Sequence, residues 1–120
     1  MTTTLTTTLT ETFHDEFVTA IEGGIGYWSG VHEYDWDRAD WFAVIEDIEG
    51  VQHRVTEDTI RLGFRLLADG GQDVGATLRA AARSLVYSGG KDTEAWEHVQ
   101  DADTADVVVQ YGLFGKLIYG

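Results

Sequence analysis

Three pairs of adjacent glycines divide this 120-residue chain, which contains no proline. The pairs are Gly23-Gly24, Gly70-Gly71 and Gly89-Gly90. Each pair follows a stretch whose apolar residues recur at helical spacing, and glycine readily takes the left-handed conformation that ends a helix. The three pairs therefore predict three helix ends.

The first helix is predicted over residues 11–22. Thr10 is a suitable N-cap, and Phe13, Phe17 and Ile21 recur along one helical face. Residues 1–9 are rich in threonine and polar, so we expect a flexible tail or an edge segment there.

The stretch after the first glycine pair predicts strands. Residues 25–36 and 41–48 are rich in aromatic and β-branched side chains, and 51–55 follows after Glu49-Gly50, a tight hairpin signal. The economical interpretation is a three-stranded antiparallel sheet.

The remaining chain predicts helices. Thr56 caps a second helix, residues 74–87 form a third, a short one ends at Val99, and a final one runs from Thr104 to about Tyr111. The predicted fold class is α+β, with a three-stranded antiparallel sheet packed against about four or five helices in a single domain, 1–120.

The chain is strongly acidic, with a net charge of −13. Residues 1–50 carry one arginine against eleven acids, whereas residues 51–91 carry six basic residues against four acids. The overall charge opposes direct binding to nucleic acid. The negative charge is compatible with three interpretations, which are high solubility, mimicry of DNA and adaptation to high salt. The chain has no cysteine, no long apolar run and no signal-peptide pattern, so we expect a soluble intracellular protein without membrane contact.

Four aromatic residues and four arginines are the candidate binding residues. The rings belong to a group of six within sixteen positions, a density that suits either core packing or a partner interface. The arginines form two pairs spaced four residues apart, which suit either ion pairs with the acidic remainder or an anion pocket. The candidates are Tyr27, Trp28, Tyr34, Trp36, Arg61, Arg65, Arg79 and Arg83.

Sequence signals for catalysis, metals and cofactors are weak. The glycines of residues 22–26 stand between a predicted helix and a strand, the reverse of the order in a phosphate loop. A helix stop is the main interpretation there, and a platform for a planar ligand is the alternative. The four histidines form no metal-binding spacing, and no serine lies in a nucleophile motif. We therefore expect no cofactor, no metal and no catalytic residue.

Three segments together resemble a family of small accessory proteins encoded by actinobacterial phages. They are 19–28 (TAIEGGIGYW), 55–60 (VTEDTI) and 102–120 (ADTADVVVQYGLFGKLIYG). The chain departs from the pattern at Lys116, where an acid is expected, and in its threonine-rich start. The resemblance transfers no activity, and it implies a phage genome, the cytoplasm of a bacterial host and an accessory role. The matching residues are Glu22, Gly23, Gly24, Tyr27, Trp28, Asp58, Thr59, Ile60, Asp103, Asp106, Gln110, Phe114, Gly115, Tyr119 and Gly120.

These observations leave two main functional hypotheses. The first is a non-enzymatic protein that binds and blocks a host or defence protein, with DNA mimicry as its extreme form. The alternative is a sponge that sequesters a small nucleotide signal between aromatic rings and paired arginines. A small hydrolase is the weaker third possibility. The apolar final segment also predicts a homo-oligomer.

Overall fold

The computed structural model describes residues 2–70 and 73–120. It confirms the predicted α+β fold, with a three-stranded antiparallel sheet and, in the described part of the chain, five α-helices. Gly71, the second residue of one glycine pair, lies outside the described residues. The elements in chain order are α1 (Thr2–Thr19), the π-helical turn η1 (Ala20–Gly24), β1 (Ser29–Asp35), β2 (Phe42–Asp47), β3 (Gln52–Thr56), α2 (Glu57–Asp69), α3 (Ala76–Tyr87), α4 (Glu94–Val99) and α5 (Ala102–Phe114).

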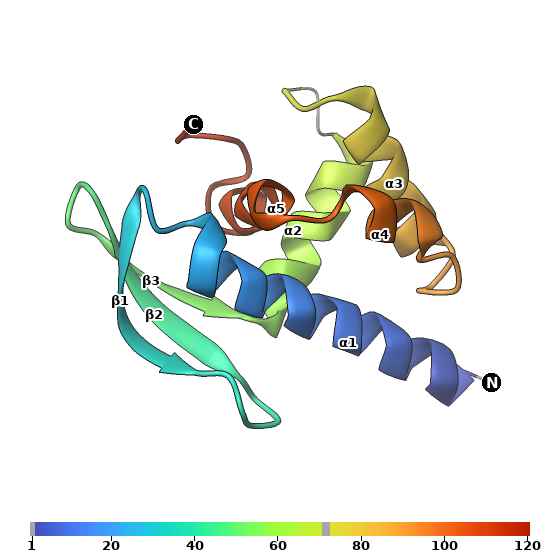
Figure 1. Ribbon diagram of the computed structural model, residues 1–120, viewed down its shortest axis with the longest axis horizontal. Coiled ribbons are helices and arrows are strands. Elements are labelled where there is room, and N and C mark those ends of the chain that lie inside the picture. Colours follow the sequence, from blue (N-terminus) through green and yellow to red (C-terminus); the bar gives the residue numbers. More distant parts are fainter. Residues whose placement is uncertain (1, 71–72) are drawn as a thin grey trace.

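The sheet lies at one end of the molecule, and α3 and α4 lie at the other (Figure 1). Its strand order is β1-β2-β3. The helices α2 and α5 cross the middle, and α1 runs along much of the length (Figure 1). Of the helix pairs, α2 and α5 share the most extensive contact.

The first helix begins earlier than the sequence predicted. Residues 2–9 form the first turns of α1, where we expected a tail or an edge segment. Threonine has only a modest helix propensity, and intrinsic propensity is a weak guide where neighbouring turns are packed. The buried rings of Phe13 and Phe17 anchor the following turns, and no glycine or proline interrupts the helix before them.

The first glycine pair does not form the expected left-handed helix stop. The chain instead makes one π-helical turn over Ala20–Gly24, and the positive φ angles fall at other glycines, including Gly50, Gly89 and Gly90. A Cβ atom at Gly24 would lie 2.6 Å from the carbonyl oxygen of Ala102. Glycine is therefore required here by the close packing of η1 on the start of α5.

The first strand begins later than predicted, at Ser29. Tyr27 and Trp28 lie in the turn that precedes it, in which the backbone N–H groups of Trp28 and Ser29 donate to the carbonyl oxygen of Ile25. Within β1, the pairing with β2 shifts register between Val31 and Glu33. Two residues of β1 therefore face one residue of β2, which is a β-bulge.

The core lies between the helices and the inner face of the sheet. Phe17 packs on Trp41 with ring centroids 4.4 Å apart, and Phe64 packs on Trp96 at 4.7 Å. Several apolar residues of α5 are buried in this core, whereas Ile118, in the final segment that suggested a self-interface, is 51% exposed. No helix among the described residues is long and apolar enough to cross a membrane.

Candidate functional site

One candidate site is a cavity of about 590 Å³ between α1, the β1–β2 connection and the start of α5. We call it the acidic pocket, because four of its nine lining residues are carboxylic acids. The lining comes from three separate parts of the sequence, which the fold brings together. The lining residues are His14, Asp15, Glu16, Val18, Thr19, Glu22, Trp36, Gln100 and Asp101.

Glu16 is the unusual residue of this pocket. Its side chain is 3% exposed, and its Oε1 accepts a hydrogen bond of 2.8 Å from Nε1 of Trp96. Its Oε2 is buried and has no hydrogen-bond partner within the described chain. The pKa of Glu16 is raised to about 7, mainly by burial and also by the charges of Asp15 and Asp101, while the hydrogen bond from Trp96 lowers it.

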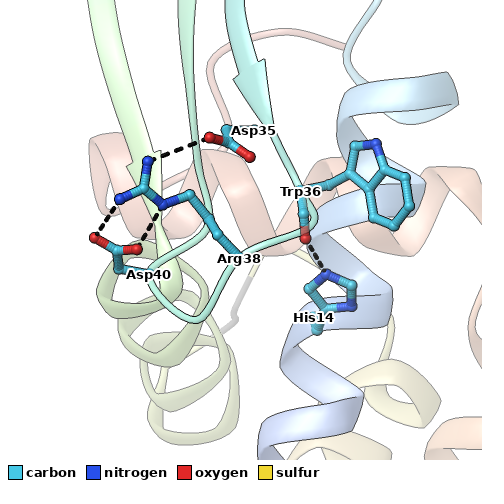
Figure 2. A network of polar contacts seen from close by, with 5 residues as sticks. All are labelled: His14, Asp35, Trp36, Arg38 and Asp40. Atoms are coloured by element: carbon cyan, nitrogen blue, oxygen red, sulfur yellow. Dashed lines mark hydrogen bonds and ion pairs between the residues drawn. The ribbon is translucent and has the colours of Figure 1, made fainter.

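Trp36 forms the aromatic wall of the acidic pocket. It follows β1, and its side chain is 49% exposed. Nε2 of His14 donates a 2.9 Å hydrogen bond to the carbonyl oxygen of Trp36, which fixes this connection against α1 (Figure 2). The indole points away from Arg38, which instead binds Asp35 and Asp40 within the same connection (Figure 2).

Two other carboxylates of the pocket, Glu22 and Asp101, accept hydrogen bonds from neighbouring groups. Glu22 accepts a 2.7 Å hydrogen bond from the hydroxyl of Tyr34. Asp101 is the N-cap of α5 and accepts from the backbone N–H of Thr104 at 2.8 Å. Within residues 2–70 and 73–120, no ion pair joins a lysine or arginine to a carboxylate of the acidic pocket. The same described residues contain no group of three side chains able to hold a metal ion.

Tyr27 and Trp28 form a separate polar network around Asp106 of α5. The hydroxyl of Tyr27 donates to Oδ2 of Asp106 at 2.6 Å, and Nε1 of Trp28 donates to Oδ1 at 2.8 Å. Gln110 donates to the same Oδ1 at 2.9 Å. Trp28 is 1% exposed, so this predicted binding residue has a structural role, whereas Tyr27 is 58% exposed.

The network around Asp106 also holds the C-terminal residues. Oε1 of Gln110 accepts hydrogen bonds from the backbone N–H groups of Ile118 and Tyr119 at 2.8 and 2.9 Å. The ring of Tyr119 stacks on Trp28 with centroids 4.9 Å apart. Residues that carry the family resemblance therefore meet in one place, although their contacts are those of a structural support.

The two arginine pairs lie on other surfaces. Arg61 binds Glu57 at 2.6 Å and lies over the ring of Phe13, while Arg65 is exposed. Arg79 and Arg83 line one hollow of about 410 Å³ with an acid, Asp69. Among the described residues, no hydrogen bond, ion pair or ring contact joins these four arginines to the four predicted aromatic residues, which are Tyr27, Trp28, Tyr34 and Trp36.

Trp36 was among the predicted binding residues, whereas the acids around it were not. A signal for Glu16 was present, because it stands three residues after Phe13 and one before Phe17. A carboxyl group at that spacing lies at the edge of the buried helix face. No pattern in the sequence indicated that Asp101, from the other end of the chain, would join it.

The chain was compared with protein-family models, curated proteins and solved structures. No family model matches it, and no curated protein or solved structure matches it either.

Proposed function

We propose that this is a small, phage-encoded accessory protein that binds and blocks a basic host or defence protein without catalysing a reaction. The observation that carries the proposal is the acidic pocket, where four acids and an exposed indole meet with no lysine or arginine among the nine lining residues. The phage context comes from the sequence resemblance, and blocking a defence protein would give the protein a counter-defence role.

Electrostatics supports a basic partner. A net charge of −13 on 120 residues creates a field that attracts positively charged surfaces and speeds their association. Nucleic-acid-binding proteins carry such surfaces, because they must neutralise phosphates. A blocker of such a protein would occupy the surface meant for nucleic acid, which is the DNA-mimic form of this proposal.

Trp36 supplies the apolar contact that an interface needs. Tryptophan is enriched among residues that dominate binding energy, and in interfaces such residues are typically surrounded by a polar rim. The indole of Trp36 is half exposed at the rim of the pocket, while its backbone is held by His14. An exposed ring on a fixed backbone loses little conformational entropy on binding.

The test begins with affinity capture from infected host cells, followed by reconstitution with the purified partner. The pocket variant Asp15→Asn/Glu22→Gln should weaken binding of the partner at least tenfold. The variant Trp36→Ala should do the same. The matched control Glu33→Gln/Glu49→Gln removes the same two charges from exposed positions outside the pocket and should bind as the wild type does. Equal binding by all four proteins would contradict the proposal.

A small hydrolase is the second candidate, favoured by Glu16. A carboxyl group whose pKa lies near 7 can act as a general acid at neutral pH. This candidate requires turnover of an ester, glycoside or peptide substrate that Glu16→Gln abolishes. The binding proposal requires that turnover is absent in the wild type.

A nucleotide sponge receives less support. It needs rings and paired guanidinium groups around one site, and the contacts of the described residues keep the two sets apart. A cyclic dinucleotide that raised the melting temperature by several degrees, with loss of the gain in Arg79→Ala, would favour the sponge over the partner-binding proposal.

A further inference from the structure

We infer that the acidic pocket binds a primary ammonium group, with Glu16 as its counter-charge and Trp36 as its aromatic wall. The ammonium could be a lysine side chain of the partner or a small free amine. The inference rests on the proposed function, because it names the chemical group of the partner that the pocket would anchor.

The residues that line the pocket determine the sign of the charge that a ligand must carry. Asp15, Glu16, Glu22 and Asp101 converge on one cavity from α1, η1 and the connection before α5. The nearby Arg38 is engaged by Asp35 and Asp40 instead (Figure 2). An anion would meet carboxylates on several sides, whereas a cation would be attracted by all of them.

Glu16 supplies a specific contact beyond this general charge. Its Oε2 is a buried acceptor with no partner in the described chain, and an unsatisfied buried acceptor of this kind is costly. Because this oxygen exposes almost no surface, a ligand donor would satisfy it only after the carboxyl group turns toward the cavity that Glu16 lines. A charged donor would gain most, because charge-assisted hydrogen bonds are the stronger ones.

The geometry favours an ammonium over a guanidinium group. A guanidinium pairs best with a carboxylate when two parallel hydrogen bonds reach both oxygens. In Glu16, Oε1 already accepts from Nε1 of Trp96, so only Oε2 remains without a partner. A compact ammonium needs just one such oxygen, and it can direct its other N–H groups toward neighbouring acceptors.

Trp36 provides an apolar surface on which the carbon chain of the ligand can pack. Tryptophan is the strongest aromatic partner for cations, and its face also packs on methylene groups. The cavity of about 590 Å³ falls within the range of about 300–1,000 Å³ typical of small-ligand sites. This volume accommodates a four-carbon amine, and the inference places its ammonium at Glu16 and its stem on the indole.

Binding should be coupled to loss of a proton. Near neutral pH the empty pocket holds Glu16 partly protonated, because burial and the nearby Asp15 and Asp101 raise its pKa to about 7. An ammonium favours the ionised carboxylate, so affinity should rise about tenfold between pH 6 and pH 8. Glu22 and His14 also line the pocket, and only the histidine can add positive charge. The contribution of Glu16 to the pH dependence is therefore measured as the difference between the affinity profiles of the wild type and Glu16→Gln.

The direct test is a titration with n-butylamine hydrochloride, followed by ¹H–¹⁵N NMR at the backbone amide signals of the residues that line the pocket, which are present in every variant. The expected dissociation constant is about 1 mM or tighter at pH 8. Glu16→Gln and Trp36→Ala should each weaken binding at least tenfold, and Glu16→Gln should flatten the pH dependence. Trp36→Ala changes an exposed side chain, so it remains informative if Glu16→Gln fails to fold. The control Glu49→Gln should bind as the wild type does.

Three outcomes would overturn the ammonium site. They are equal binding by wild type and Glu16→Gln, tighter binding of n-butylguanidine than of n-butylamine, and displacement of the amine by calcium at equal concentration. Binding of Nα-acetyl-lysine N-methylamide, with loss on acetylation of its side chain, would support a lysine side chain as the source. Binding of butylamine alone would support a free amine.

The two proposals fail in different ways. If butylamine binds but Asp15→Asn/Glu22→Gln captures the same partner as the wild type, the ammonium site stands and the partner-blocking function fails. If the partner requires the pocket but no amine binds there, the function stands and the ammonium assignment fails.

Discussion

The indole nitrogen of Trp96 lies 2.8 Å from Oε1 of Glu16, and this hydrogen bond joins α4 to α1 across 80 residues of sequence. Both side chains are buried, so the bond fixes the carboxyl group at the boundary between the core and the acidic pocket. It holds one oxygen and leaves the other without a partner in the described chain. This arrangement makes the stability of the protein depend on pH.

The stability of the protein should fall between pH 5 and pH 8 because of Glu16. The pKa of its carboxyl group is about 7 in the folded chain, compared with 4.5 as the ordinary value. The folded state therefore binds more protons than the unfolded state in this window, and the free energy of unfolding decreases as the pH rises. The shift corresponds to about 3 kcal/mol, fully present below pH 4.5 and lost above pH 7.

Urea denaturation at pH 5 and pH 8 measures this effect. Glu16→Gln cannot ionise, so it should gain about 2–3 kcal/mol relative to the wild type over this interval, slightly less than the full effect of the shift. Glu11→Gln is the control, because Glu11 is an exposed acid on the same helix. Parallel pH dependence in the wild type and Glu16→Gln would show that burial does not perturb this carboxyl group.

Gly24→Ala and Gly23→Ala should have opposite effects on stability, although they are neighbours. A Cβ at Gly24 would collide with the carbonyl oxygen of Ala102, whereas a Cβ at Gly23 meets no atom within 4 Å. We expect Gly24→Ala to lower the free energy of unfolding by about 2 kcal/mol or more, as overpacking does. Gly23→Ala should be neutral or slightly stabilising, because alanine restricts the unfolded chain. Thermal and urea unfolding followed by circular dichroism would separate the two, and equal destabilisation would refute the packing argument.

Asp106→Asn should destabilise the fold by about 2–3 kcal/mol, because it weakens a charged acceptor used by three donors. Those donors are the side chains of Tyr27, Trp28 and Gln110. Asp103→Asn removes the same charge from an exposed position on the same helix and should change stability far less. Chemical denaturation of both variants measures the difference, and similar losses in the two would mean that only net charge matters.

Removing the ring of Tyr119 should expose Trp28 to solvent. The two rings stack at 4.9 Å with planes 10° apart, so Tyr119 covers one face of the indole. Tyr119→Ala should increase acrylamide quenching of tryptophan emission, measured in a Trp36→Phe background to remove the exposed indole. Ile118→Ala truncates an exposed neighbour and should leave quenching unchanged. The stacking contact would be unimportant if both changes behaved alike.

The sequence predicted the sheet and the order of the helices because local signals determine them. Glu49-Gly50 forms the expected turn, with a positive φ of 84° at Gly50. Thr56 precedes α2 as expected, and its backbone N–H donates to Oγ1 of Thr59. Such turns and caps depend on a few neighbouring residues, so they can be predicted from short patterns.

The errors arose where distant segments decide the local conformation. Gly24 resembles a helix stop in the sequence. In the fold it instead packs closely against the backbone of Ala102, which lies far along the chain. Trp28 resembles a strand residue, yet Asp106 of α5 holds it in a turn. The acidic pocket was missed for the same reason, because Asp101 and Glu16 meet only after α1 and α5 have packed.

The irregular pairing of β1 sets a limit on how molecules of this protein can associate. Between Val31 and Glu33 the outer strand departs from regular spacing, and a bulge of this kind disrupts the row of backbone groups that a further strand would need. Growth of the sheet by addition of another chain along β1 is thereby discouraged. At high concentration the protein should resist fibril formation along this border, and any assembly would have to use a different surface.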